Sequence, residues 1–344
     1  MTRESAGLIE ALVDDGRPLI SLTGLSLALS GGFAIFQSAT GHFLPHDTDF
    51  LQMAPQDLCS INECRIVHFM FHDRVSFAGA LIGIAVLYLW LAAFPLKERE
   101  AWSWWTLLVS GIVGFGSFLT YLGYGYLDTW HGAATLALLP CFVTGLWKSY
   151  QTLITMPLPH DRPHDRKLSL WSWLSPRPGR PWRSQAGLGS VCLLICAVGM
   201  MGAGMTIQGI GMTTVFVPTD LTFMGLAREQ LDAINPRLIP LIAHDRAGFG
   251  GAVATTGILL FACVWWGRAS RSLWQALLIG GIAGWSTAIG VHPIIGYTDA
   301  GHLAPAILGA LFFFIGLTMT RYWMWSGHQA VPTQPVHGAT PLGT

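Results

Sequence analysis

The sequence predicts an all-α integral membrane protein with eight transmembrane helices, built as a tandem duplication of four-helix bundles. The first observation behind this is composition: of 344 residues, 52% are hydrophobic and only 11% are charged, whereas soluble domains carry about 25% charged residues. The second is a set of long apolar runs. The third is a polar motif, His-Asp-Arg, that occurs at 72–74 and again at 244–246, each time seven residues after an arginine.

The apolar runs are each about 20 residues long, which is the length an α-helix needs to cross the hydrocarbon core of a bilayer. Eight are expected, at 19–38, 66–95, 103–123, 129–150, 188–216, 238–266, 272–293 and 301–325. Glycine is frequent inside them, and small residues let membrane helices approach closely.

The remaining segments complete the domain organisation. We expect a cytoplasmic N-terminal segment at 1–18, a first four-helix membrane unit at 19–150, a cytoplasmic linker at 151–187, a second four-helix membrane unit at 188–325 and a disordered C-terminal tail at 326–344. Most Lys and Arg residues lie in the loops on the linker side, and such residues favour the cytoplasm. Both termini are therefore predicted to be cytoplasmic, in a bacterial-type inner membrane.

Net charge excludes one class of partner. Nineteen Lys and Arg balance nineteen Asp and Glu, so the net charge gives no case for nucleic acid as a partner. The expected partner is the lipid bilayer, with a quinone or another membrane redox protein as a further possibility.

Each polar motif has the same surroundings in both halves. Arg65 precedes the first motif and Arg237 the second, and an Asp-x-x-His pattern follows each at 128–131 and 299–302. Upstream, Asp49 and Met53 match Asp220 and Met224. Repetition of this kind predicts a duplicated structural unit.

Haem is the leading interpretation of the repeated histidines. Helices two and four of a four-helix bundle lie close enough for one imidazole from each to bind the two faces of a haem iron. The predicted axial pairs are His72 with His131 and His244 with His302. Gly79 and Gly251 lie on the same helix faces as the first His of each pair and would leave room for a macrocycle.

The other charged residues of the motif have expected roles around this haem b. Arg74 and Arg246 would hold its propionates. The carboxylates would orient the imidazoles through their second nitrogen, with the flanking arginines as outer support: Asp73, Asp128, Asp245, Asp299, Arg65 and Arg237.

Three alternatives stay open. The His and Asp side chains could bind zinc in a metal-dependent membrane hydrolase. They could form a proton relay in a transporter. They could also bind no cofactor and simply cap helices and pair with one another.

The arrangement resembles the haem A synthase family. The likeness covers 19–325 and rests on eight spans in two halves, a His at the outer start of each even-numbered span, and a Cys pair in an outer loop. It implies a membrane oxidoreductase that works at the outer face, by electron transfer or by an oxidation similar to that of the family. The acidic residue that the family carries three positions before its first His is replaced here by Phe69.

Several further residues are candidates for chemistry. His68 lies one turn before His72, and His292 ends the seventh apolar run; each is a candidate acid or base, or an alternative ligand. Cys59 and Cys64 are predicted to form a disulfide in an oxidising outer compartment. The remaining candidates are interfacial tyrosines that could line a quinone or the edge of a haem: Tyr121, Tyr124, Tyr126 and Tyr297.

Overall fold

The structure is a computed structural model that describes residues 13–126, 129–155 and 182–326, and those residues contain helices and no β-strand. The long helices are α2 (Arg17–Ala39), α5 (Arg65–Ala93), α6 (Ala101–Leu119), α7 (Thr129–Thr155), α9 (Gln185–Gly211), α12 (Leu238–Trp265), α13 (Arg271–Ile295) and α14 (Ala300–Ser326). The short ones are α3 (Pro45–Leu51), α4 (Pro55–Cys59), η2 (Asn62–Cys64), η3 (Thr120–Tyr124), α10 (Pro218–Met224) and α11 (Arg228–Ile234).

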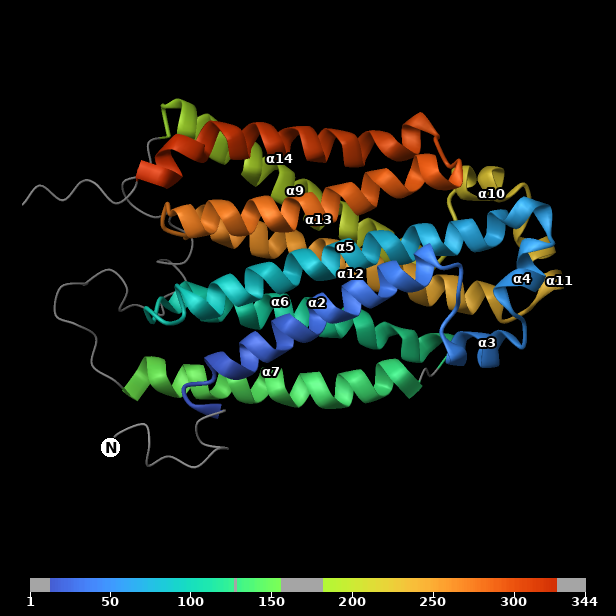
Figure 1. The fold of residues 1–344 in the computed structure, drawn as a ribbon, viewed down its shortest axis with the longest axis horizontal. Coiled ribbons are helices and arrows are strands. Elements are labelled where there is room, and N and C mark those ends of the chain that lie inside the picture. Colours follow the sequence, from blue (N-terminus) through green and yellow to red (C-terminus); the bar gives the residue numbers. More distant parts are fainter. Residues whose placement is uncertain (1–12, 127–128, 156–181, 327–344) are drawn as a thin grey trace, which may run out of the picture.

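Seven of these helices are long and apolar enough to cross a membrane, which is typical of a multi-pass membrane protein. They correspond to seven of the eight expected spans. The remaining expected span, 129–150, corresponds to α7, a 27-residue helix that runs along the bundle in Figure 1 but is not among the seven. The expected N-terminal segment, linker and C-terminal tail lie largely outside the described residues.

The long helices form one bundle in which the two predicted units are interlocked (Figure 1). At its centre α5 packs against α12. Around this pair, α5 contacts α2 and α13, while α12 contacts α9 and α6. The third helix of each predicted unit therefore packs mainly on the second helix of the other unit, which differs from two self-contained four-helix bundles.

Two glycines permit this exchange of partners. A Cβ atom at Gly79 would lie 1.8 Å from Oγ1 of Thr287 on α13, and one at Gly251 would lie 1.8 Å from Oγ of Ser117 on α6. Both positions are thus points of close helix approach. The room expected there for a haem macrocycle is occupied by neighbouring helices, which corrects the role predicted for these two glycines.

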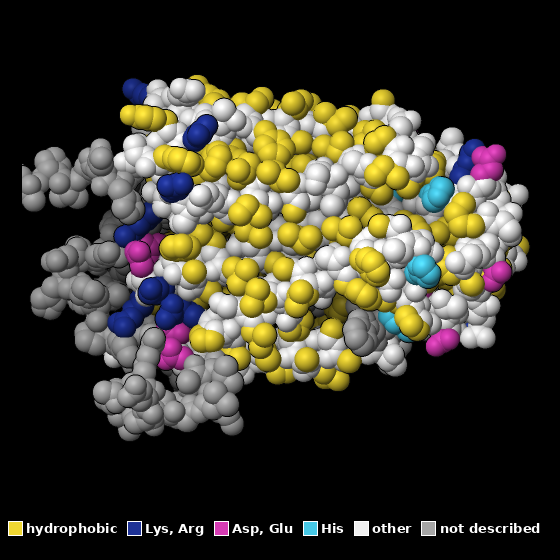
Figure 2. All heavy atoms as spheres, viewed as in Figure 1, with side chains coloured by type: hydrophobic (Ala, Val, Ile, Leu, Met, Phe, Trp, Pro, Cys, Tyr) yellow, Lys and Arg dark blue, Asp and Glu magenta, His cyan; other side chains and the backbone are white. Residues whose placement is uncertain are grey.

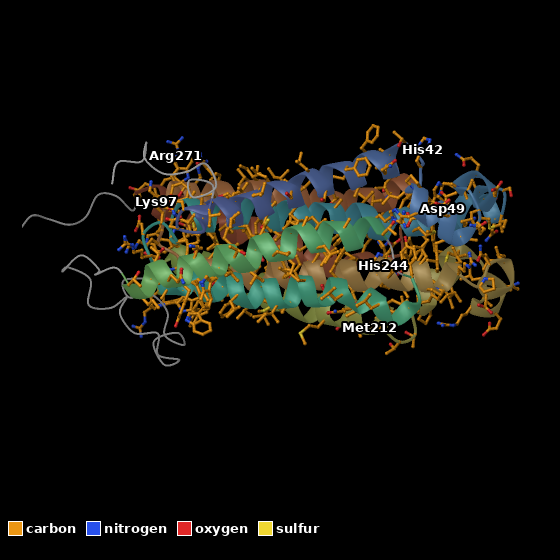
Figure 3. All side chains as sticks on the ribbon, turned by 90° about the horizontal axis from the view of Figure 1, so that it is seen from below. His42, Asp49, Lys97, Met212, His244 and Arg271 are labelled. Atoms are coloured by element: carbon orange, nitrogen blue, oxygen red, sulfur yellow. A yellow bond between two sulfur atoms is a disulfide. The ribbon has the colours of Figure 1, made fainter. Side chains whose placement is uncertain are left out.

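The two ends of the bundle differ in chemistry. Figure 2 shows Lys and Arg side chains gathered at one end and His side chains toward the other, with a largely apolar belt between them. Figure 3 places Lys97 and Arg271 at the first end, and His42, Asp49 and His244 toward the second. The short helices α3, α4, α10 and α11 cover this second end (Figure 1). It is called the histidine end below.

Candidate metal centre

Two arginines tie α5 to α12 at the histidine end. Arg74 donates from Nε to Oδ2 of Asp245 at 2.7 Å and from Nη1 to Oδ2 of Asp47 at 2.7 Å. Arg246 donates to Oδ2 of Asp73 at 3.3 Å and to Oδ2 of Asp220 at 2.5 Å. Each arginine of one motif therefore pairs with the aspartate of the other.

This network is buried, with side-chain exposure between 0% and 14%. Such charges are tolerated away from water only when they are paired and hydrogen-bonded. Both guanidinium groups are already held by two carboxylates. The structure thus gives Arg74 and Arg246 a different role from the predicted one of binding haem propionates, and Asp245 binds Arg74 where it was expected to orient an imidazole.

Asp47 belongs to this network, but the comparison of the two halves of the sequence matched Asp49, and not Asp47, with Asp220. It is the third residue of α3, and Asp220 is the third residue of α10; both helices begin with proline. The matched pair is therefore Asp47 with Asp220, whereas Asp49 is exposed. A shared Pro-x-Asp pattern at 45–47 and 218–220 was the available signal.

Asp47 lies outside the membrane-spanning helices, and its pKa is lowered by its partners in the network. Burial on its own would raise the pKa of this carboxyl, but Arg74 and a hydrogen bond from Tyr126 outweigh burial and lower the pKa below 3.8. Asp47 therefore stays ionised in the folded protein.

Three histidines meet beside this network. Nε2 of His72 on α5 lies 3.0 Å from Nε2 of His292 on α13, and the ring of His302 on α14 lies 5.4 Å from that of His72 and 5.2 Å from that of His292. Each offers one nitrogen, and the three nitrogens lie within 4.8 Å of one another. His72 and His292 are buried and His302 is half-buried.

The outer nitrogens of two of these imidazoles face oxygen atoms. Nδ1 of His72 lies 3.1 Å from Oδ1 of Asp73, and Nδ1 of His302 lies 3.1 Å from the phenol oxygen of Tyr297, which hydrogen-bonds in turn to Asp220 at 2.8 Å. Nδ1 of His72 makes no hydrogen bond with the described residues. The Tyr297 hydroxyl donates to Asp220, so it accepts a hydrogen bond from Nδ1 of His302, which leaves the Nε2 lone pair of His302 free to bind a metal ion.

This grouping differs from the predicted axial pairs. His302 lies beside His72 of the first half and His292 of its own half, whereas His244, its predicted partner, lines a separate cavity. The side chain of His131 and residue Asp128 lie outside what the structure describes, so the pair of His72 with His131 remains a prediction. His292, considered from the sequence as an alternative ligand, is the residue that brings the group to three.

The three-histidine group does not fit a haem. Two axial nitrogens on one iron lie about 4 Å apart, on opposite faces of a macrocycle, whereas Nε2 of His72 and Nε2 of His292 are only 3.0 Å apart and their rings are in edge contact, with no space for a macrocycle between them. Three imidazole nitrogens around one point fit a single ion better. At metal–nitrogen distances of about 2.0–2.1 Å, ligand nitrogens lie about 3.4 Å apart in a tetrahedron.

A polar cleft adjoins the group. Its walls include Tyr297 and also His68, Arg65 and Asp299. The ring of Tyr297 stacks on His302 with centroids 4.4 Å apart, so the same side chain contacts both the cleft and the histidines. His68 is half-buried on the α5 face that leads from the cleft toward His72.

The remaining predicted residues have local roles. Asp299 accepts a hydrogen bond from the backbone N–H of His302 at 2.7 Å at the start of α14. Arg65 binds Glu63 and Arg237 binds the carbonyl of Phe50. Cys59 and Cys64 are joined in a disulfide.

The second motif has different surroundings. His244 lies against the ring of Tyr126 at 5.1 Å and that of Phe118 at 6.4 Å. It lines an apolar cavity between α2, α5, α6, α7 and α12. Within the described residues, no group of three metal-ligating side chains forms around it.

Comparisons with known proteins add no assignment. No protein-family model, no curated protein and no solved structure matches the chain. The functional reading therefore depends on the site itself.

Proposed function

We propose that this protein is a membrane metalloenzyme that binds one transition-metal ion with the imidazoles of His72, His292 and His302. The observation that carries the proposal is the approach of these three nitrogens to within 4.8 Å of one another. Imidazole ligands without thiolates suit zinc, copper, iron or nickel, and three protein ligands with one open position are typical of catalytic zinc.

The surrounding residues support an ion at this position. Tyr297 provides the kind of oxygen partner that commonly orients a metal-binding histidine, and Asp73 places a carboxylate oxygen 3.1 Å from Nδ1 of His72. The three helices that supply the ligands come from both halves of the sequence. The Arg–Asp network holds Asp73 through Arg246 and Tyr297 through Asp220.

The chemistry we propose is hydrolysis at the histidine end of the bundle, on its outer side. A bound zinc ion would supply an activated water molecule at neutral pH. His68 on the cleft wall is suited to carry a proton to or from a substrate, and Arg65 would favour a substrate group with negative charge. We also propose that α7 spans the membrane and that the two halves arose by duplication, which the matched Arg–Asp pairs favour. The Lys- and Arg-rich end of the bundle favours cytoplasmic termini.

The test is the metal content of the purified full-length chain. Elemental analysis should give one equivalent of metal per chain, and cobalt(II) added to the metal-free protein should produce the visible bands of a tetrahedral nitrogen-ligated ion. His72→Ala, His292→Ala and His302→Ala should each lose this metal. His244→Ala, the same residue of the other motif, should keep it.

Two results would overturn the proposal. One is a chain that takes up no more metal than His72→Ala after incubation with zinc, cobalt, copper or iron. The other is a Soret band in the purified protein that disappears in His72→Ala, because it would assign haem to this histidine.

A further inference from the structure

A second site lies on the other side of the bundle, beside His244. The cavity between α2, α5, α6, α7 and α12 is open on one side, and it and the solvent at its mouth together span about 1560 Å³ not filled by protein atoms. It involves none of the three histidines of the candidate metal centre. What it binds is therefore a separate question from the metal.

The cavity is long. On α5 its lining runs from Arg74 to Tyr88, and on α12 from His244 to Thr255. Fourteen residues of α-helix rise about 21 Å, so the cavity extends from the charged network deep into the apolar part of the bundle. This length suits a ligand with a long apolar tail.

Its charged groups are confined to one end. Asp47, Arg74 and Asp245 lie there, whereas the rest of the wall is uncharged and mostly apolar and contains four phenylalanines: Phe33, Phe77, Phe115 and Phe118. A lining of this kind, apolar with a few placed polar groups, is typical of small-molecule sites. The ligand is then an amphiphile with its head at the histidine end.

The charges at that end exclude an acidic head. Arg74 is already bound by both Asp47 and Asp245 at 2.7 Å, so a phosphate or carboxylate would face two carboxylates without a free cation. A cationic head would have to displace the arginine from the same carboxylates. An uncharged head is compatible with the network as it stands.

One hydroxyl in the cavity wall has no hydrogen-bond partner among the described residues. Oγ1 of Thr135 on α7 is buried and makes no hydrogen bond with any residue that the structure describes. A buried hydroxyl without a partner is destabilising, so a ligand oxygen at this point would be favoured. His244 lines the same cavity and carries a second group able to donate or accept.

We infer that this cavity binds an uncharged amphiphile with an oxygen-bearing ring and a long apolar tail, the chemistry of an isoprenoid quinone. The ring lies at the histidine end, where its oxygens bind Thr135 and His244 and its faces contact phenylalanine side chains. The tail extends along α5 toward Tyr88. The inference concerns binding and holds whether or not the metal centre is occupied.

The test uses a decyl-tailed benzoquinone and the full chain in nanodiscs. Gly248 lines the cavity, and a Cβ atom there would meet nothing within 4 Å, so Gly248→Leu should fill the cavity without disturbing the fold. We expect saturable binding by calorimetry that weakens about tenfold or more in Gly248→Leu and about fivefold in Thr135→Val. An organic extract of the purified protein should also contain a quinone, and less of it from Gly248→Leu.

The matched control is Gly199→Leu on α9, an exposed position where a Cβ atom also meets nothing within 4 Å. It should bind the quinone as the natural chain does. If Gly248→Leu fails to fold, Ala252→Phe and Thr135→Val test the same cavity from other sides.

Three outcomes would overturn the inference. Equal affinity in the natural chain, Gly248→Leu and Thr135→Val would mean that the probe only partitions into lipid. Tighter binding of decanoate or decylamine would mean a charged ligand. A Soret band that Gly248→Leu abolishes would mean that haem occupies the cavity.

Discussion

The regions around His72 and His244 carry the same tripeptide but have different contents. Around His72, two further imidazoles and Tyr297 fill the space next to the Arg246 pairs. Around His244, aromatic rings and an elongated apolar cavity adjoin the Arg74 pairs. The Arg–Asp network is therefore the shared framework of the two regions. Side chains from α13 and α14 distinguish the His72 region, and side chains from α6 and α7 distinguish the His244 region.

The framework itself should give the largest effect. Arg74→Met and Arg246→Met each leave two buried carboxylates without a cation, and removing one partner of a buried ion pair costs about 3–5 kcal/mol. Unfolding in mixed detergent–SDS titrations should show a similar loss for both variants. Arg271→Met at the opposite, exposed end is the control.

The same measurement can contradict this view of the framework. A loss below about 1 kcal/mol for either variant would mean that the network does not hold the bundle together. Adding Asp47→Asn and Asp245→Asn to Arg74→Met should recover part of the lost stability, because the uncompensated charges are then removed.

Tyr297 and Tyr126 test the difference between the two regions. Tyr297 and Tyr126 each hydrogen-bond to the aspartate of a short helix, Asp220 and Asp47, but Tyr297 also contacts Nδ1 of His302. Tyr297→Phe should lower the affinity for zinc about tenfold, as loss of an orienting partner does. Tyr126→Phe should leave it unchanged; equal affinity of both variants and the natural chain would contradict a metal at these histidines.

The smallest expected effect concerns pH. The pKa of Asp47 is lower in the folded protein than its ordinary 3.8, so the folded state binds this proton less tightly than the unfolded state does. The stabilisation is present above pH 3.8 and is lost as the pH falls through the lower folded-state value. Asp47→Asn should be less stable than the natural chain at pH 7, by about 1 kcal/mol, and the difference should shrink in acid.

Exposed Asp49→Asn provides the control for this pH series. It should follow the natural chain at every pH. An Asp47→Asn variant whose deficit stays constant down to pH 2.5 would contradict the assignment of the effect to this carboxyl.

Much of the helical architecture could be predicted because apolar length is a local property of the chain. Seven expected spans correspond to long apolar helices, and the motif residues lie at one end of the bundle. The site was predicted only in part. His72, His292 and His302 were all named, but their grouping was not, because the packing of α13 on α5 joins residues that lie 220 positions apart.

Composition and spacing along the chain were enough to predict which segments are apolar helices, which end of the bundle holds the histidines, and that the His-Asp-Arg motif recurs in the two halves. Only the tertiary structure decided that Arg74 binds Asp245 across the two halves, that Asp47 belongs to the network, and that His292 joins His72. Helix partners are selected by close contacts such as that of Thr287 with Gly79. Such a contact depends on the shapes of two helix surfaces at once, so the residue pattern of either helix alone does not reveal it.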